Sequence, residues 1–145
     1  ALTLLVLLMT GIAKKYKKPD VGSIHHEIKV LDRLDQIHPG VFLCELTEGG
    51  RLVGFVMKKF SGETVDSLIK RKKLSSAEKM SLIISFAKSV RKLQKLGICH
   101  SDLHTQNLLV SGKEINIIDY GNAIIFDQNT QTDSGLTGTD FLRPP

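Results

Sequence analysis

Five polar residues whose side chains could take part in catalysis or metal binding lie in one short stretch of the chain. They are His100, Asp102, His104, Asn107 and Asp119. Carboxylate and amide oxygens are hard ligands, and they suit Mg²⁺ held jointly with phosphate oxygens better than they suit a soft metal. Asp102, Asn107 and Asp119 therefore indicate a site for phosphate chemistry.

Two other interpretations compete with this one. His100 and His104 have the spacing of a zinc-binding histidine pair, but such a pair binds from one face of a helix, and the leucines and the turn here argue against a helix. A purely structural role is the second interpretation, because a single Asp in a loop commonly forms a turn or caps a helix. Taken singly, each of these residues fits such a role.

A long helix must lead the chain into this polar stretch. It is predicted to begin with a capping box formed by Ser75 and Glu78 and to end at Gly97. A shorter helix is expected before it, within residues 61–73. The apolar face expected for the long helix consists of Ile83, Phe86, Ala87, Val90 and Leu93.

Two short strands are predicted to follow the polar stretch. They cover residues 107–110 and 114–119, and a Ser-Gly-Lys turn joins them. From Tyr120 onward the chain is rich in Thr, Gly and Asp, which predicts a long loop.

The first part of the chain predicts strands around a single helix. Residues 2–9 and 12–17 have the composition of strands, and a Gly-Gly pair within residues 41–60 indicates a hairpin. Ser23 is placed to cap the helix. The apolar stripe of that helix consists of Ile24, Ile28, Leu31 and Leu34.

The composition is that of an ordinary globular chain: 145 residues, 41% hydrophobic, 24% charged, with a net charge of +5. Its two basic clusters, at 14–18 and 70–73, lack a series of stacking aromatics, so no nucleic-acid partner is expected. Cys44 and Cys99 lack metal-binding spacing, which favours a reduced, cytoplasmic protein without a disulfide framework. The apolar run at the start is too short to cross a bilayer, so no membrane partner is expected.

Several motifs resemble those of one enzyme family. HSDLHTQN at 100–107, followed by IIDYGNA at 117–123, resembles the H-R-D-L-x-x-x-N catalytic loop and the D-F-G motif of the protein kinases. IAKK at 12–15 is similar to the strand that carries V-A-I-K. HHEIKVLDRLDQIHPGV at 25–41 is similar to the helix that bears the glutamate partner of that lysine, with the His-Pro turn after it.

The resemblance extends through most of the chain. LVGFVMKKFSGETVDSLI at 52–69 resembles the strand, hinge and short helix that hold adenine, and GTDFLRPP at 138–145 resembles the end of the activation segment. These pieces occur in kinase order. The resemblance implies an α+β, two-lobed protein-kinase-like fold that is truncated. It implies a β-rich N-lobe with one helix over residues 1–60 and part of a helical C-lobe over 61–145. The second region would contain a catalytic loop at 100–107 and an activation segment at 119–145.

The resemblance also implies roles for individual residues. Asp102 would accept the proton of the substrate hydroxyl, while Asn107 and Asp119 would hold Mg²⁺ on the phosphates of ATP. Lys15 best fits the A-x-K spacing of the lysine that binds the phosphates, and Lys14 is the alternative, since strand alternation sends the two to opposite faces. Glu27 is predicted to lie on the apolar side of its helix, where a carboxylate needs a cation, and a pair with Lys15 would supply it. The alternative is that Glu27 lies at the edge of the apolar stripe, in water.

Other positions carry over from the same resemblance. Met57 stands at the gatekeeper position, and the backbone of Lys58 to Phe60 would meet the edge of adenine. His104 stands where serine/threonine kinases usually have a lysine near the transferred phosphate, and Ser101 replaces the arginine of many catalytic loops.

The leading hypothesis is therefore a fragment of an ATP- and Mg²⁺-dependent kinase that acts on Ser or Thr hydroxyls of a protein. Ser101 and His104 favour an alternative, a small-molecule phosphotransferase of the aminoglycoside or choline type. A pseudokinase or interaction module is a third possibility, because no G-x-G-x-x-G precedes the lysine strand and Gly11 is the only glycine before position 22.

Overall fold

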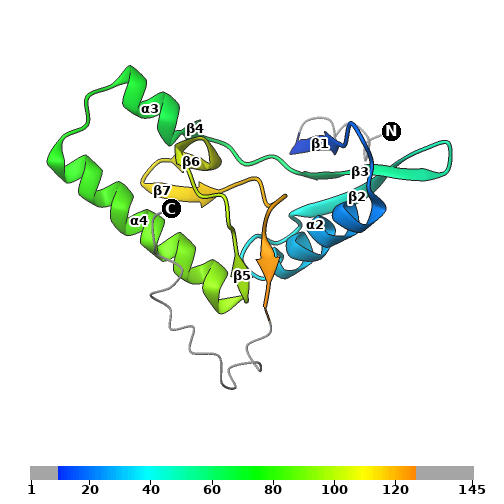
Figure 1. Cartoon of the computed structure of the whole chain (residues 1–145). Helices are drawn as coiled ribbons and strands as arrows, with labels where there is room; N and C mark the ends of the chain where they lie inside the picture. Colours follow the sequence, from blue (N-terminus) through cyan, green and yellow to red (C-terminus); the bar gives the residue numbers. More distant parts are fainter. Residues whose placement is uncertain (1–9, 127–145) are drawn as a thin grey trace.

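The computed structural model of the chain describes residues 10–126 (Figure 1). Its first part is a three-stranded antiparallel sheet in the order β1-β3-β2, with one helix packed against it. The elements of this part are β1 (Gly11–Lys15), α2 (Val21–Leu34), β2 (Phe42–Glu48) and β3 (Arg51–Lys58). The strand predicted over residues 12–17 is thus confirmed with shifted bounds, whereas the one predicted over 2–9 lies outside the described residues.

The second part contains the remaining helices and two small sheets. Strands β4, β6 and β7 form one sheet, and β5 pairs with β8 in the other. The elements are β4 (Glu63–Thr64), α3 (Val65–Arg71), α4 (Ser76–Lys95), β5 (Ile98–Cys99), the 3₁₀ turn η1 (Thr105–Asn107), β6 (Leu108–Ser111), β7 (Glu114–Ile117) and β8 (Ile124–Ile125). A single linker between β3 and β4 joins the two parts (Figure 1).

Helix α2 begins earlier than the sequence predicts. The prediction that Ser23 caps it is wrong, because Asp20 is the N-cap and its carboxylate accepts the backbone N–H of Ser23 at 3.1 Å. Asp is as effective as Ser at this position, since either side chain satisfies an N–H that has no partner within the helix. The helix therefore gains three residues at its start, Val21, Gly22 and Ser23.

Helix α4 confirms the predicted capping box but not the whole predicted face. The backbone N–H of Glu78 donates to Ser75 Oγ at 3.1 Å, and the N–H of Ser75 donates to Glu78 Oε2 at 2.8 Å. The prediction is wrong for Ile83 and Ala87, which are exposed. The apolar residues of the packed face are Leu82, Phe86, Val90 and Leu93.

Two serines explain this difference. Ser85 Oγ accepts the N–H of Ile115 at 2.8 Å, and Ser89 Oγ donates to the carbonyl of the same residue at 2.6 Å. These two bonds fix the side of α4 that lies along β7. Because the side chains of a helix are spaced about 100° apart, Ile83 and Ala87 are carried away from that side.

Both predicted hairpins are confirmed, and each turn uses glycine where the backbone has positive φ. Gly49 and Gly50 join β2 to β3 with φ of 56° and 74°, and Gly112 lies between β6 and β7 with φ of 62°. The loop predicted from Tyr120 onward is wrong in its first part, since β8 pairs there with β5. The rest of the segment, residues 127–145, lies outside the described residues.

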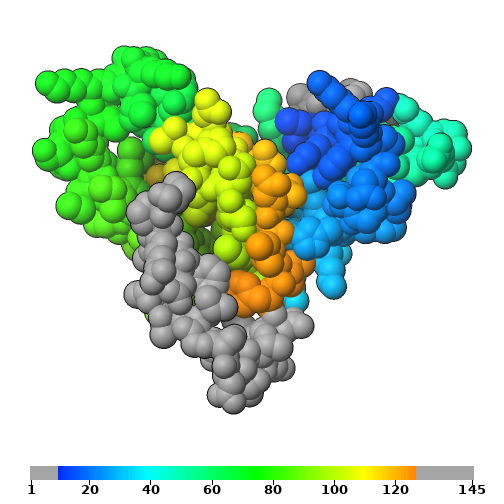
Figure 2. Space-filling view, viewed as in Figure 1, coloured from blue at the N-terminus to red at the C-terminus, as the bar shows by residue number. Residues whose placement is uncertain are grey.

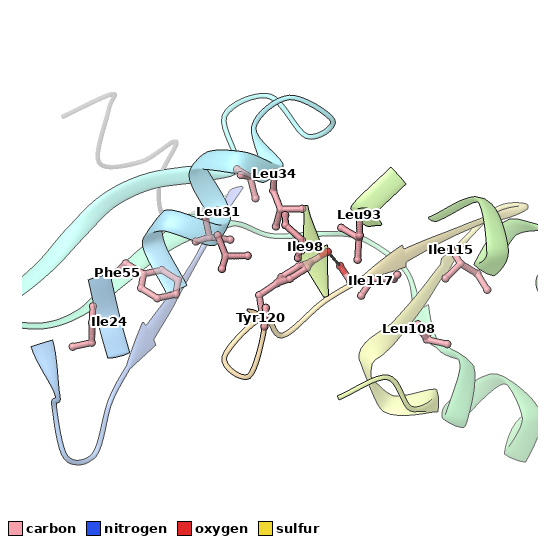
Figure 3. Packing of buried hydrophobic residues seen from close by; sticks show 13 residues of the cluster. Ile24, Leu31, Leu34, Phe55, Leu93, Ile98, Leu108, Ile115, Ile117 and Tyr120 are labelled. Atoms are coloured by element: carbon pink, nitrogen blue, oxygen red, sulfur yellow. Dashed lines mark hydrogen bonds between the residues drawn. The ribbon is translucent and has the colours of Figure 1, made fainter. Parts of the chain in front are cut away.

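One continuous apolar core runs through both parts (Figure 3). Phe55 of β3 and the α2 side chains lie toward one end, and the β6 and β7 side chains lie toward the other. Between these ends lie Leu93, Ile98 and Tyr120, each at most 3% exposed. Burial of one such side chain contributes roughly 1.5–3 kcal/mol. The core therefore fixes α2 relative to β7, and polar groups from both parts can be held facing one another.

Candidate active site

A buried ion pair links the first strand to helix α2. Lys14 Nζ donates to Glu27 Oε1 at 2.8 Å and to Oε2 at 3.0 Å. The side chain of Glu27 is 3% exposed and that of Lys14 is 36% exposed. Burial of Glu27 agrees with its predicted place on the apolar side of α2, and the ammonium group compensates the cost of burying its carboxylate.

The predicted Lys15–Glu27 pair is wrong. Lys15 Nζ instead donates to Glu48 Oε1 at 2.6 Å, and both side chains of that pair are more than half exposed. The cause is strand register: Lys14 is paired with Phe55 of β3, whose side chain is fully buried together with those of α2. Side chains of directly paired residues project from the same face, so Lys14 faces α2 and Lys15 faces away.

Tyr16 is a member of this cluster that the sequence reasoning missed. Its hydroxyl donates a hydrogen bond to Glu27 Oε2, and Lys14 Nζ lies 5.5 Å from the centre of its ring. Burial raises the pKa of the Tyr16 hydroxyl, and the hydrogen bond to Glu27 and the negative charge of Glu27 raise it further. The i, i+2 spacing from Lys14 could have revealed it, since such residues share one strand face.

Asp119 completes the cluster from the far end of the β6–β7 hairpin. Its Oδ1 lies 3.3 Å from Lys14 Nζ and accepts the N–H of Gly121 at 3.4 Å. Burial opposes ionisation of Asp119, but the Lys14 charge and these hydrogen bonds outweigh it, and the pKa of the carboxyl lies below its ordinary value. Asp119 also has φ of 61°, a conformation that costs energy in a non-glycine residue and is often found at functional sites.

The loop before β6 brings together the other predicted residues. Asn107 Nδ2 donates to the backbone carbonyl of Asp102 at 2.9 Å and lies 3.3 Å from Asp102 Oδ2. The same nitrogen is 3.0 Å from His104 Nε2, which lies 3.7 Å from Asp102 Oδ2. The side chain of Asp102 is 41% exposed, so its carboxylate is held by the loop but is accessible to a substrate.

His100 and Ser101 fix the conformation of the start of this loop. His100 is buried, its Nε2 lies 2.8 Å from the carbonyl of Ile118, and its ring packs edge-on against Tyr120 with centroids 5.1 Å apart. This geometry agrees with the structural interpretation of His100. Ser101 has φ of 66°, which turns the backbone sharply between the buried histidine and Asp102.

The loop and Asp119 are joined through the backbone. The N–H of Ile118 donates to the carbonyl of Asn107 at 2.9 Å, which places Asn107 beside the residue that precedes Asp119. Figure 2 shows an open notch at the top of the view, between the blue residues of the first strand and helix and the yellow residues around β6. Lys14 and Glu27 come from the first part of the molecule, whereas Asp119 and the loop from His100 to Asn107 come from the second part.

The residues of the site fit a phosphate-bound Mg²⁺. Among the described residues, no hydrogen bond reaches Asn107 Oδ1 or Asp119 Oδ2, so each can offer a hard oxygen to the ion. Gly121 leaves space between the charged groups: a Cβ there would lie 3.3 Å from Lys14 Nζ and 3.5 Å from Asp119 Oδ1. Within residues 10–126, no group of three or more His, Cys, Asp or Glu side chains could hold a metal by itself.

The predicted adenine-contacting residues lie at the end of β3. Met57 is paired with Ile12, two residues before Lys14, so Met57 and Lys14 lie on the same sheet face. The N–H groups of Lys58 and Lys59 donate to Val41 and Thr10, whereas no hydrogen bond uses the N–H of Phe60 within the described part of the chain. That N–H is free to meet a ligand.

Comparison with known proteins gives consistent matches. The family described as protein kinase domain matches residues 9–145. A probable myosin light chain kinase of Dictyostelium discoideum is 23% identical over 142 residues, covering 92% of this chain and 36% of the relative. Ribosomal protein S6 kinase 2 alpha of Xenopus laevis is 30% identical over 120 residues, covering 78% of this chain and 16% of the relative. Serine/threonine-protein kinase dkf-1 of Caenorhabditis elegans is 27% identical over 145 residues, covering 91% of this chain and 19% of the relative.

A solved structure has the same fold. The crystal structure of the yeast RNA Pol II CTD kinase CTDK-1 complex matches 81% of this chain and 40% of that chain, with a TM-score of 0.60 and 18% identity. This match confirms the predicted α+β, two-lobed protein-kinase-like architecture. The chain spans less than half the length of each of these relatives.

Proposed function

Because the chain belongs to the protein kinase domain family, we propose that it forms the ATP-binding and catalytic part of a serine/threonine protein kinase. The reaction breaks the bond between the γ-phosphorus of ATP and its bridging oxygen, and releases ADP. A new bond forms between that phosphorus and the substrate hydroxyl oxygen, and the hydroxyl proton passes to Asp102. The relatives are named as protein kinases, which favours a protein substrate over the small-molecule alternative.

The cluster of Lys14, Glu27 and Asp119 is the observation that carries this proposal. It joins a strand, a helix and the end of a distant hairpin through two ion pairs of 2.8 and 3.3 Å. The cluster also contains Asp119, whose positive φ is a conformation that concentrates at functional sites. The ammonium group of Lys14, held in place by these two carboxylates, can stabilise phosphate oxygens without reorganisation during the reaction.

Each residue has a specific proposed role. Lys14, rather than Lys15, binds the α- and β-phosphate oxygens, and Glu27 orients its ammonium group. Asn107 and Asp119 hold Mg²⁺, which neutralises charge on the phosphates when bound. His104 contacts both Asp102 and Asn107, so it is placed to hold the catalytic loop and to reach the transferred phosphate.

The backbone of Lys58 and Phe60 is the proposed contact for the edge of adenine, with Met57 beside it. We further propose a cytoplasmic location, which the free thiols of Cys44 and Cys99 support. Among residues 10–126, no helix combines the length and apolar character that a membrane crossing requires. The absence of nucleic-acid and membrane partners stays a prediction.

Phosphate transfer tests the proposal directly. The full-length protein is incubated with γ-labelled ATP, Mg²⁺ and a mixed library of Ser- and Thr-containing peptides. We expect labelled peptides, no label when Mg²⁺ is chelated, and a loss of roughly 10²–10⁴-fold in Asp102→Asn. Asp32→Asn, at an exposed position of α2, is the matched control and should retain the wild-type rate.

Three results would contradict the proposal. Label on a sugar, choline or aminoglycoside panel with none on peptides would favour the small-molecule phosphotransferase. ATP binding with no transfer to any acceptor would favour the pseudokinase. Undiminished transfer in Asp102→Asn would remove that residue from the mechanism.

A further inference from the structure

A second hollow lies away from the phosphate-binding cluster. It encloses about 690 Å³ between α4, β7, the linker after β3 and the turn after α2. Its apolar lining includes Ile37, Phe60 and Ile84. Of the residues assigned to ATP binding or phosphate transfer, only Lys58 and Phe60 line it, and both are assigned to adenine through their backbone. We call this hollow the lysine groove.

Positive charge dominates the lysine groove. Its exposed cations are Lys58, Lys59, Lys88, Lys92 and Lys113. Among residues 10–126, Glu114 is the only acidic residue that lines it. Within the described residues, none of the ion pairs involves any of these five lysines. The groove therefore has uncompensated positive charge that an anionic ligand would neutralise.

His38 at the edge of the groove responds to this charge. Burial lowers the pKa of its imidazole, and the positive charges of Lys92 and Lys58 lower it further. The ring of His38 packs edge-on against Phe60, with centroids 4.9 Å apart. The field of the lysines thus reaches the apolar wall of the groove.

The distribution of the lysines indicates an extended ligand. Lys88 and Lys92 lie one turn apart on α4. The other cations lie at the end of β3, on the linker after it and in the β6–β7 turn, so the five lysines do not come from one loop. Cβ atoms one helical turn apart are about 6 Å from each other. Alternate side chains of an extended peptide are about 7 Å apart, so carboxylates on one side of such a peptide match this spacing.

We propose that the lysine groove binds an extended acidic peptide segment of a protein partner or substrate. Acidic side chains at alternate positions pair with Lys88 and Lys92, and an apolar side chain packs against Phe60 and Ile84. The groove is a docking site separate from the reacting groups. Its occupation requires neither nucleotide nor phosphate transfer.

Fluorescence anisotropy tests this proposal on the full chain without nucleotide. The probe is a fluorescein-labelled peptide with glutamate at alternate positions and one central leucine. We expect the double variant Lys88→Glu and Lys92→Glu to bind at least tenfold more weakly. The control, Lys73→Glu with Lys79→Glu, makes the same charge change at exposed residues outside the groove and should change the affinity less than twofold.

Two further variants are measured with the same peptide. Lys88→Gln with Lys92→Gln should weaken binding to an intermediate degree, and Lys14→Met should leave it unchanged. Equal weakening in both charge-reversal variants, or loss of binding in Lys14→Met, would overturn the proposal. It would also be overturned if an oligothymidylate of equal charge bound as tightly and depended on the same lysines, because the groove would then bind any polyanion.

Discussion

The hydroxyl of Tyr16 donates a hydrogen bond to the carboxylate of Glu27, the same carboxylate that binds Lys14. Two donors, one on β1 and one just after it, therefore hold a glutamate on α2. Because the pKa of Tyr16 is raised, its hydroxyl remains a donor at neutral pH. The position of Glu27, and through it that of Lys14, depends on both contacts.

Tyr16→Phe removes this hydrogen bond and keeps the ring beside Lys14. We expect the free energy of unfolding to fall by roughly 1–2 kcal/mol, because a buried carboxylate loses one donor. The affinity for Mg²⁺-ATP should fall several-fold, as Lys14 is held less firmly. Urea unfolding and titration calorimetry measure the two effects, and a wild-type affinity with lowered stability would leave Tyr16 with a structural role alone.

Glu27→Gln removes the carboxylate that pairs with Lys14, and Glu48→Gln removes the one that pairs with Lys15. Glu27 is buried, so its loss should cost about 2 kcal/mol of stability even with a partly exposed Lys14, and should weaken Mg²⁺-ATP binding strongly. Glu48 is more than half exposed, and its pair with Lys15 should contribute at most about 0.5 kcal/mol. Equal effects of the two variants in urea unfolding and calorimetry would contradict the assignment of Lys14.

Acid should weaken the start of α4. The pKa of Glu78 is lowered from 4.5 to about 2. The largest cause is the hydrogen bond from Lys72, followed by the hydrogen bonds with the backbone and the hydroxyl of Ser75. Because this pKa is lower in the folded state, the stability from Glu78 is complete above about pH 5 and is lost as the pH falls from 4.5 toward 2. An NMR titration of Glu78 checks the pKa, and Glu78→Gln should reduce the pH dependence of urea unfolding in this window. A midpoint near 4.5 would refute the predicted contacts.

The features that depend on neighbouring residues could be predicted from the sequence. The capping box of Ser75 and Glu78 needs only a spacing of three residues, and both hairpins follow from glycines between strand-like segments. The loop from His100 to Asn107 could be recognised because its residue types and their spacing occur together.

Features that depend on the packing of distant elements could not be predicted from the sequence. Alternation along β1 shows that Lys14 and Lys15 face opposite sides, but only the register with Phe55 and the position of α2 decide which side is the core. The short strand β8 forms because β5 is beside it. The orientation of α4 likewise depends on the hydrogen bonds of Ser85 and Ser89 to Ile115.

The central claim is that Lys14, held by Glu27 and adjacent to Asp119, binds the phosphates of ATP. The most direct measurement compares peptide phosphorylation by the full-length protein with that of Lys14→Met and Lys15→Met, at a temperature at which thermal unfolding shows all three proteins to be folded. We predict a loss of at least 100-fold in Lys14→Met and a rate within twofold of the wild type in Lys15→Met. Loss of transfer in Lys15→Met together with full transfer in Lys14→Met would contradict the account.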